Sequence, residues 1–365
     1  MKILLATPYG SGLAGGISRW AEHITSYHKN KGHNDCEMTL FPMGRKYEEI
    51  HNSKLSRFKS GMRDYIKYTK KLSKVMKENS YDLVHIASSA SLGLIKDLLM
   101  IDVAHRNRAK VAIHFRFGRI PELAEKRNWE WKLLCRVIKK ADSIIVLDKA
   151  SYNTLINKGF NNIYLLPNPL TPKITALLKE NNYSIKERTI LFAGHGLRTK
   201  GIYELIDACQ QIPNIKLRMI GVIQEEIKAS LYERSNNAEW LEICGKQPYD
   251  VVIKEMLSCD IFVLPTYTEG FPNVILESMA CGCAIVTTPV GAIPEMLEEE
   301  NGKHYGILVT PQNTQELKEG IETLLNNRTL KEECRRNVQQ RVNERYNIDA
   351  VWKQMLNIWK DTIKQ

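Results

Sequence analysis

The residues best placed to do chemistry are two glutamates eight positions apart, Glu269 and Glu277, in a stretch that reads Thr-Glu-Gly-Phe-Pro-Asn-Val-Ile-Leu-Glu. An apolar run that predicts a buried strand precedes them, and an apolar helical pattern follows the Gly-Phe-Pro turn. We therefore expect Glu269 on a loop at the carboxyl end of a strand, where a carboxylate can bind ligand hydroxyls. Two glutamates at this spacing are ordinarily solvated, and it is the strand, turn and helix around them that favour function.

A glycine-rich turn over residues 191–201 carries the second group of candidates. It leads from a strand pattern into a helical pattern, with the cations Arg198 and Lys200 near its end. An open backbone and the positive end of a helix suit a diphosphate. The turn is not a Walker A loop, because Gly201 follows the lysine where Ser or Thr would be needed.

A second glycine-rich stretch, residues 10–15, spells Gly-x-Gly-x-x-Gly between a strand and a helix and permits a dinucleotide-binding interpretation. Two features oppose it: Pro8 and Tyr9 separate the strand from the glycines, and Leu-Phe-Pro stands where the second strand would offer an acid to a ribose. Both features weaken the dinucleotide-binding interpretation.

Histidine and arginine side chains follow the apolar run 111–113. His114 ends that run, and a histidine in such a place is ordinarily structural. Arg116 and Arg119 come next, and each either meets an anionic acceptor or is an ordinary surface charge.

Short strand patterns alternate with longer helical patterns, which predicts α/β architecture with parallel sheets covered on both faces. Helices of the first half are expected to start near residues 16, 56, 91, 122 and 149. Three prolines in residues 167–172 indicate a linker. We therefore expect two doubly wound, Rossmann-like domains, 1–168 and 169–347, facing across a cleft, and a last helix, 348–365, that returns to the first domain.

Composition and charge limit the class of protein. The 365 residues are 43% hydrophobic and 25% charged, which is typical of a globular chain, and no apolar run is long enough to span a bilayer. The net charge of +11 is concentrated in residues 1–169, which hold 29 lysines and arginines against 15 aspartates and glutamates. Residues 54–77 hold nine of these cations on a helical pattern, which is typical of a helix drawn to anionic lipid and also of a solvated helix face.

The stretch from Glu269 to Glu277 resembles the E-x7-E signature of retaining glycosyltransferases of family 4, which have the GT-B fold. Other positions that match the family pattern are Gly221 and residues 244–245, 278–282, 290–295 and 306–309. The likeness is dense over residues 189–310 and looser over 1–170. It implies that Glu269 binds hydroxyls of the transferred sugar and that Glu277 binds the nucleotide ribose.

The resemblance also implies roles for other residues. Lys200 matches a lysine that grips the diphosphate, but His195 stands where the family has an arginine, so Arg198 is expected to supply that charge. His114 is expected beside the donor sugar or the reacting centre. The remaining residues implied in donor binding are Gly15, Gly16, His195, Gly245, Lys246, Phe271, Asn273 and Val274. Candidates for the acceptor side are Arg19, Arg116 and Arg119.

The activity that the resemblance implies is transfer of a sugar from a nucleotide diphosphate sugar to a lipid-linked or cell-surface glycan, with retention of anomeric configuration. The nucleotide sugar is then a co-substrate, and no cofactor is expected. No Asp-x-Asp sequence occurs in the chain, so metal-independent catalysis by Glu269, Lys200, His114 and Arg198 is predicted.

The basic first half predicts a cytoplasmic enzyme held peripherally on the inner face of the cell membrane, with an anionic membrane surface as partner. Two alternatives remain. One is a nucleotide-sugar epimerase on the same scaffold, and the other is a basic nucleic-acid-binding module. No nucleic acid is expected as a partner, because aromatic platforms and known RNA motifs are missing.

Overall fold

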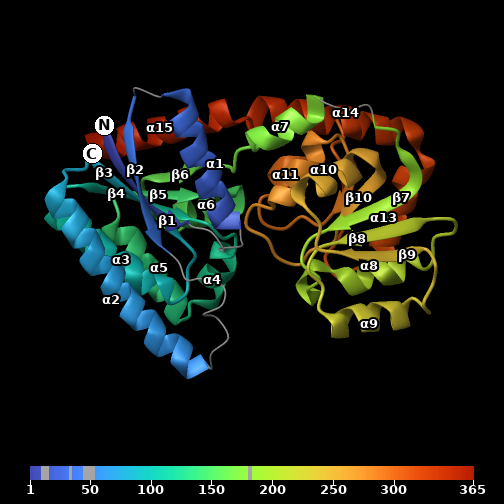
Figure 1. The fold of residues 1–365 in the computed structure, drawn as a ribbon, viewed down its shortest axis with the longest axis horizontal. Helices are drawn as coiled ribbons and strands as arrows, with labels where there is room; N and C mark the ends of the chain where they lie inside the picture. Colours follow the sequence, from blue (N-terminus) through green and yellow to red (C-terminus); the bar gives the residue numbers. More distant parts are fainter. Residues whose placement is uncertain (10–15, 33–34, 44–53, 180–182) are drawn as a thin grey trace. The chain divides into compact units, whose positions relative to one another are not determined.

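The computed structural model describes residues 1–9, 16–32, 35–43, 54–179 and 183–365, without the side chains of 54–63, 172 and 179. The chain divides into two compact units (Figure 1). Unit 1 consists of Met1–Pro169 and Ile348–Gln365, and unit 2 of Leu170–Asn347. The division expected from the prolines fell after residue 168.

Unit 1 is built on a six-stranded parallel sheet in the order β2-β1-β3-β4-β5-β6. Its strands are β1 (Lys2–Pro8), β2 (Glu37–Met43), β3 (Leu83–Ser88), β4 (Lys110–Phe115), β5 (Ser143–Val146) and β6 (Ile163–Leu165). The strands are short, apolar and mostly buried, as strands covered on both faces must be.

Different helices cover the two faces of this sheet. One face packs on α2 (Lys54–Glu78), α3 (Gly93–Arg106), α4 (Ile120–Lys126), α5 (Trp129–Lys140) and α6 (Lys149–Asn157). The other packs on α1 (Gly16–Lys31) and α15 (Ile348–Lys364). Because side chains alternate along a strand, Val84 and Ile86 of β3 enter the first core and Leu83 and Ala87 the second.

The last helix, α15, closes the second face of the unit 1 sheet although it follows all of unit 2 in sequence (Figure 1). Its apolar stripe, including Val351, Met355 and Trp359, is buried there. The predicted return of the last helix to the first domain is therefore confirmed.

One helix was expected to start near residue 122, and the structure has two. The first, α4, ends where Arg127 adopts a left-handed conformation with a φ of 46°. Asn128 then caps α5, because its side-chain oxygen accepts a hydrogen bond of 3.0 Å from the amide of Trp131. An internal cap of this kind splits a continuous apolar pattern into two helices.

Unit 2 has its own six-stranded parallel sheet, in the order β12-β11-β10-β7-β8-β9. Its strands are β7 (Lys186–Ala193), β8 (Lys216–Ile220), β9 (Leu241–Gly245), β10 (Cys259–Leu264), β11 (Ala284–Thr287) and β12 (Ile307–Leu308). The helices are α7 (Pro172–Lys179), α8 (Ile202–Cys209), α9 (Glu225–Arg234), α10 (Tyr249–Ser258), α11 (Asn273–Ala280), α12 (Ile293–Leu297), α13 (Thr314–Asn326) and α14 (Arg328–Arg345), with a short 3₁₀ helix, η2, at Arg198–Lys200.

The segment predicted to be a linker runs straight into α7. Pro172 is the first residue of that helix, a position where its missing N–H costs nothing. The amide of Leu170 donates a hydrogen bond of 2.7 Å to the carbonyl of Tyr346, so the start of unit 2 is tied to its end.

Candidate functional site

The centre of the unit 2 sheet is the place where its strand order reverses. Strands β7, β8 and β9 run outward on one side, and β10, β11 and β12 on the other, so β7 and β10 are neighbours at the switch point. Ligands of doubly wound sheets bind outside the carboxyl ends of the strands at such a point. The loops that leave β7 and β10 carry the two predicted motifs.

Lys200 and Glu269 meet at this switch point. Lys200 comes from η2 after β7, Glu269 comes from the loop after β10, and the Lys200 ammonium donates to Glu269 Oε1 in an ion pair. Both side chains are mostly buried, with 22% of the lysine and 13% of the glutamate exposed. The structure therefore brings together the two side chains for which the sequence predicted the most direct roles.

Backbone hydrogen bonds hold the two loops against each other. The amide of Tyr267 donates to the carbonyl of Thr199 at 2.8 Å, and the hydroxyl of Thr266 donates to the same carbonyl at 3.2 Å. The buried hydroxyl of Thr288, from the loop after β11, donates in turn to the carbonyl of Thr266. Three adjacent loops thus fix the distance between the lysine and the glutamate.

Glycines allow the close approach of these loops. Gly291 has a φ of +57°, and a Cβ built on it would lie 2.5 Å from the carbonyl oxygen of Glu269. Gly201 has a φ of +69°, and its Cβ would lie 2.0 Å from the carbonyl oxygen of Pro265. Only glycine meets both the left-handed conformation and the contact at these two positions.

The rest of the glutamate motif is placed by α11. Asn273 and Val274 open this helix, Glu277 is buried on it, and the Phe271 ring packs edge-on against Tyr346 with the ring centroids 5.8 Å apart. Phe271 and Val274 pack against the unit 2 core, which anchors the motif.

The other donor-side candidates are spread over neighbouring loops. His195 and Lys246 are exposed, and Gly245 accepts a hydrogen bond from the amide of Gly221, which joins the loops after β8 and β9. The Arg198 guanidinium lies 5.4 Å from the centre of the Tyr203 ring on α8. Arg198 therefore points to α8, whereas Lys200 points to Glu269.

Unit 1 contains a buried series of side chains at the end of β4, each within hydrogen-bond distance of the next. The Trp359 indole donates to His85 Nδ1 at 2.9 Å, His85 Nε2 lies 3.3 Å from His114 Nδ1, and His114 Nε2 lies 3.0 Å from Arg116 Nη1. His85 and His114 share one face of β3 and β4, where Ala87 and Ala112 leave room for the rings.

The surroundings of these histidines keep them neutral. Burial lowers the pKa of His85 to about 3 and the pKa of His114 well below 6.5, and the Arg116 cation lowers both further. The Arg116 guanidinium lies 4.4 Å from the centre of the Trp20 ring and donates to Asn168 Oδ1. Sequence reasoning did not single out His85, Trp359 or Trp20, because the pairing of β3 with β4 and the packing of α1 and α15 on the sheet bring them to His114.

The acceptor-side candidates lie in different settings. Arg119 forms an ion pair of 2.7 Å with the buried carboxylate of Glu130, which also accepts hydrogen bonds from the amide and hydroxyl of Ser91. Arg19 is exposed on the first turn of α1, which begins at Gly16. Gly15 and the rest of residues 10–15 lie outside the described residues.

Two family descriptions match adjacent parts of the sequence. Glycosyltransferase Family 4 matches residues 14–173, and Glycosyl transferases group 1 matches residues 174–341. An uncharacterized glycosyltransferase of Methanocaldococcus jannaschii is 31% identical over 192 residues, which are 52% of this chain and 52% of that protein. A capsular polysaccharide biosynthesis glycosyltransferase of Staphylococcus aureus is 27% identical over 255 residues, 67% of this chain and 62% of that protein. The matched parts therefore span little more than half the length of these relatives.

Solved structures of glycosyltransferases have the same fold over the whole chain. Sucrose-phosphate synthase from Thermosynechococcus elongatus has a TM-score of 0.78 at 17% identity and covers 100% of this chain and 99% of its own. HepE from Anabaena, in complex with UDP, has a TM-score of 0.74 at 19% identity and covers 99% of this chain and 100% of its own. The sequence thus matches Glycosyltransferase Family 4 in unit 1 and Glycosyl transferases group 1 in unit 2, and the fold is that of GT-B glycosyltransferases.

The expected fold class is confirmed, because both units are doubly wound parallel sheets with helices on both faces. Within the described ranges, no group of three His, Cys, Asp or Glu side chains is arranged as metal ligands would be. No helix of the described residues has both the length and the apolar character that crossing a membrane requires.

Proposed function

We propose that this glycosyltransferase takes a sugar from a nucleotide diphosphate sugar and passes it, with retention of anomeric configuration, to a glycan or lipid-linked acceptor. The observation that carries the proposal is the Lys200–Glu269 pair at the switch point of unit 2. In this proposal unit 2 holds the donor and unit 1 presents the acceptor.

The chemistry of the pair selects the ligand. The lysine and the glutamate compensate each other's charge, so a ligand that engages both must offer an anion to the ammonium and hydrogen-bond donors to the carboxylate. A sugar diphosphate offers both, with phosphate oxygens next to several hydroxyls. A simple anion would satisfy Lys200 and repel Glu269.

Catalysis would then rest on the departing diphosphate. Lys200 stabilises the negative charge that develops on the leaving oxygen, and the first amides of α11, at Asn273 and Val274, add their partial positive charge. Glu269 orients the sugar through its hydroxyls, which leaves the acceptor to attack from the face that the diphosphate leaves. The fixed Lys200 cation and the helix amides make a divalent ion unnecessary in this scheme.

Two comparisons support the choice of substrates. HepE, which shares the fold, was solved in complex with UDP, which supports a nucleotide donor. The Staphylococcus aureus relative acts in capsular polysaccharide biosynthesis, which supports a glycan as acceptor.

A thermal-shift screen of UDP-, GDP- and ADP-sugars tests the proposal. A donor present at 100 times its Kd should stabilise the protein by about 2.7 kcal/mol. Product analysis with the donor that binds then separates transfer from epimerisation: a new glycosidic bond is expected, and an isomerised nucleotide sugar without transfer would favour the epimerase. Failure of every nucleotide sugar to stabilise the protein would overturn the proposal.

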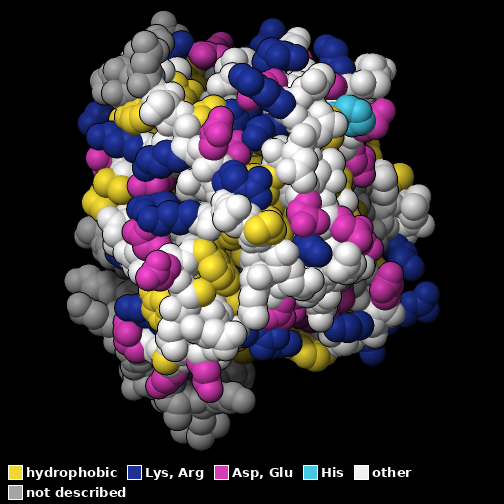
Figure 2. Space-filling model, turned by 90° about the vertical axis from the view of Figure 1, so that its right-hand side faces the viewer, with side chains coloured by type: hydrophobic (Ala, Val, Ile, Leu, Met, Phe, Trp, Pro, Cys, Tyr) yellow, Lys and Arg dark blue, Asp and Glu magenta, His cyan; other side chains and the backbone are white. Residues whose placement is uncertain are grey.

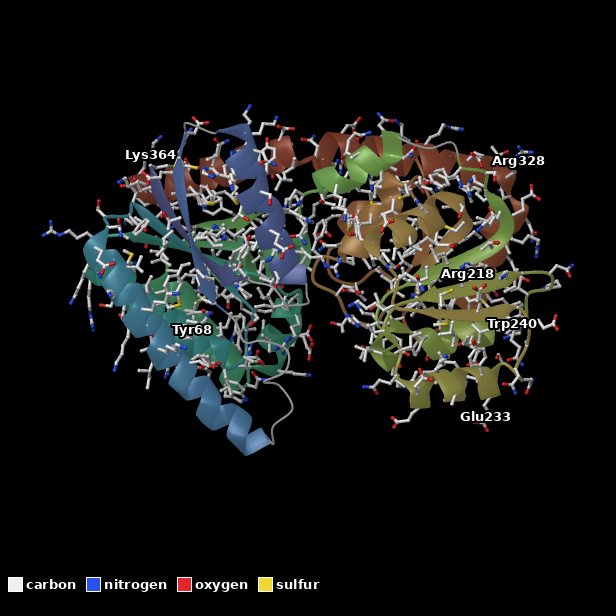
Figure 3. All side chains as sticks on the ribbon, in the orientation of Figure 1. Tyr68, Arg218, Glu233, Trp240, Arg328 and Lys364 are labelled. Atoms are coloured by element: carbon white, nitrogen blue, oxygen red, sulfur yellow. The ribbon has the colours of Figure 1, made fainter. Side chains whose placement is uncertain are left out.

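A specific observation favours an additional interaction with an anionic membrane surface. Helix α2 exposes Lys67, Lys70, Lys74 and Lys77, while Leu72 and Met76 on its opposite side are buried against unit 1. Tyr68 likewise lies on the side of α2 that packs on the unit 1 core (Figure 3). The apolar stripe thus serves the domain core, and the cationic face is left to solvent, where it can attract anionic lipid and hold the enzyme at the inner face of the membrane.

A further inference from the structure

The hydrogen-bonded series Trp359–His85–His114–Arg116 contains one N–H donor more than its three contacts can use. A neutral imidazole has one N–H donor and one acceptor nitrogen, whereas an indole and a guanidinium only donate. Three contacts of 2.9, 3.3 and 3.0 Å join the four side chains, and four N–H groups point into them. One of the three contacts must therefore bring two donors face to face.

The mismatch can lie at the middle contact or at either end of this series of side chains. At the middle contact, Trp359 and Arg116 both donate, and His85 Nε2–H faces His114 Nδ1–H. If the Trp359 indole donates to His85 Nδ1 and His85 Nε2 donates to His114 Nδ1, the mismatch lies at the Arg116 end. The His114 proton is then on Nε2 and faces Arg116. If instead Arg116 donates to His114 Nε2, every proton shifts by one place, and the His85 Nδ1 proton faces the Trp359 indole.

Burial decides between these three arrangements. Trp359, His85 and His114 are all fully buried, so two of their N–H groups that face each other, at the Trp359 contact or at the middle contact, are both left without an acceptor. An unsatisfied buried donor costs about 1–3 kcal/mol. Arg116 is only partly buried and has five N–H groups, so it can turn one of them to another acceptor at much lower cost. The surplus proton therefore belongs at the Arg116 end, with the His114 proton on Nε2.

Arg116 also lacks an anionic partner in the described part of the chain. Its contacts there are the Asn168 amide oxygen, the His114 ring and the face of the Trp20 ring. Burial lowers the pKa of Arg116 to about 9, which still leaves it charged at neutral pH. A half-buried cation among neutral groups, beside a second donor, is an arrangement that an anionic oxygen would satisfy.

We propose that Trp359 and His85 are positioning residues that hold the His114 proton on Nε2, and that His114 and Arg116 together bind an anionic oxygen of a ligand. The chemical class is a phosphate or carboxylate oxygen that accepts one hydrogen bond from each side chain. This inference rests on the proposed function only in that the ligand is taken to be a substrate. The oxygen then belongs either to the diphosphate of the donor or to an acidic group on a sugar.

The test reads the histidine protons directly in the full chain. Long-range ¹H–¹⁵N spectra of histidine side chains distinguish the two neutral tautomers, and His114→Gln identifies the His114 signals. Wild type should show His114 protonated on Nε2 at pH 7. Trp359→Phe removes the indole donor, so the protons should shift by one place and His114 should become the Nδ1-protonated tautomer, with Arg116 donating to Nε2.

A matched control is Trp352→Phe. Trp352 is buried on the same helix, and its ring contacts those of Tyr27, His28 and Trp359. Phenylalanine keeps a ring against Trp359 and leaves the Trp359–His85 hydrogen bond in place, so the His114 tautomer should stay as in wild type. Finding His114 protonated on Nδ1 in the wild-type protein would overturn the proposal without any variant. Finding the same tautomer in wild type and Trp359→Phe would overturn the positioning role.

Ligand binding is tested with two probes, inorganic pyrophosphate for the diphosphate and glucuronate for an acidic sugar. The probe that belongs here should shift the His114 Nε2 signal, and Arg116→Gln should weaken that effect at least tenfold, whereas Lys254→Gln, at an exposed residue of α10, should not. The anion site would be overturned if neither probe shifted the His114 Nε2 signal, or if Arg116→Gln left the shift unchanged. These readouts need no turnover: absence of nucleotide-sugar binding would sink the proposed function alone, and an unchanged tautomer in an active enzyme would sink this inference alone.

Discussion

Lys200 and Glu269 lie 69 positions apart in the sequence and form an ion pair in the structure. Their two loops leave the neighbouring strands β7 and β10, and the carbonyl of Thr199 accepts hydrogen bonds from both Thr266 and Tyr267. The pair is therefore a product of the backbone, and not of two flexible side chains that happen to meet. Such a fixed pair can be separated by mutation into an anion-binding part and a hydroxyl-binding part.

Substituting the pair should separate binding from turnover. Glu269→Ala should lower kcat at least 100-fold and leave nucleotide affinity near wild type, because its proposed partner is the sugar. Lys200→Ala should lower turnover and also weaken nucleotide binding about tenfold or more, because a charge-assisted hydrogen bond to the diphosphate contributes about 1.5–3 kcal/mol. Kinetics and calorimetry with the donor found in the screen check both.

The controls for these substitutions are Glu226→Ala and Lys254→Ala, which change exposed residues of α9 and α10 in the same unit. Both should behave as wild type. Near-wild-type transfer by Glu269→Ala would remove this residue from the site, and equal nucleotide affinity in Lys200→Ala and wild type would remove the diphosphate from Lys200.

Gly291→Ala should damage the site without touching either charged residue. A Cβ at this position would lie 2.5 Å from the carbonyl oxygen of Glu269 and 2.6 Å from that of Gly270, so the loop that bears the glutamate must move. We expect kcat to fall about tenfold or more, since displacements on this scale are costly for positioned groups.

Gly302→Ala is the matched control for the effect of backbone strain. Gly302 also has a positive φ, +71°, but nothing lies within 4 Å of its added Cβ. Both variants should lose about 1 kcal/mol of unfolding free energy from the left-handed conformation, and only Gly291→Ala should lose turnover. Equal activity of the two variants would contradict the role assigned to the Glu269 loop.

Turnover should survive chelation of divalent ions. The chain contains no Asp-x-Asp sequence, and Lys200 and the amides of α11 are fixed where the diphosphate is proposed to leave. Transfer measured in excess EDTA should equal transfer measured with added magnesium or manganese. Activity that disappears in EDTA and returns with either ion would show that the leaving group needs a metal.

The sequence predicted the two-unit α/β fold and the candidate motifs, because local patterns carry both. Strand and helix periodicity shows in the alternating segments, and the glycine turn and the glutamate loop are continuous stretches. What the sequence did not show depends on long-range packing. His85 lies within an apolar strand with no local signal, and Trp359 reaches it only because α15 returns to unit 1.

Arg119 illustrates the same limit for a surface charge. From the sequence, Arg116 and Arg119 were equal candidates for an anionic acceptor. In the structure Arg119 is paired with the Glu130 carboxylate, which also accepts two hydrogen bonds from Ser91, whereas the described partners of Arg116 are neutral. Only the tertiary contacts of α5 and the turn after β3 distinguish the two arginines.

Unit 1 should become less stable as the pH falls below about 6.5. The folded pKa values of His85 and His114 lie far below the ordinary value of 6.5, so the unfolded chain binds protons that the folded chain does not. The free energy of unfolding should fall by about 1 kcal/mol for each of these histidines between pH 7 and pH 5.5.

Urea unfolding followed by tryptophan fluorescence measures this loss, since five of the six tryptophans belong to unit 1. His114→Gln removes one titrating group, so its unfolding free energy should depend less on pH than that of wild type, by about 1 kcal/mol over the same interval. The same pH dependence in His114→Gln and in wild type would show that His114 is not held neutral.

Binding to anionic membranes should depend on the exposed lysines of α2. Among the side chains of α2 that the structure describes, Lys67, Lys70, Lys74 and Lys77 are exposed, and Lys74 lies 3.9 Å from the Glu78 carboxylate. Lys71 lies 5.3 Å from the centre of the Phe41 ring and is kept. Each lysine near an anionic leaflet contributes about 1 kcal/mol, so changing all four to glutamine should weaken binding to anionic liposomes at least tenfold. Salt should weaken wild-type binding in the same direction, because the Debye length shortens.

The control must remove the same charge elsewhere in unit 1. Lys158, Lys353, Lys360 and Lys364 are exposed on other elements, with Lys364 at the end of α15 (Figure 3), so their change to glutamine gives an equal net charge without altering α2. Figure 2, which views the molecule from the side of unit 2, shows basic and acidic side chains interspersed there, a pattern by which unit 2 should add little attraction to a charged surface. Co-sedimentation should therefore fall with the α2 variant and not with the control. Equal loss in both would mean that net charge alone draws the protein, and binding indifferent to lipid charge would leave α2 as an ordinary solvated helix.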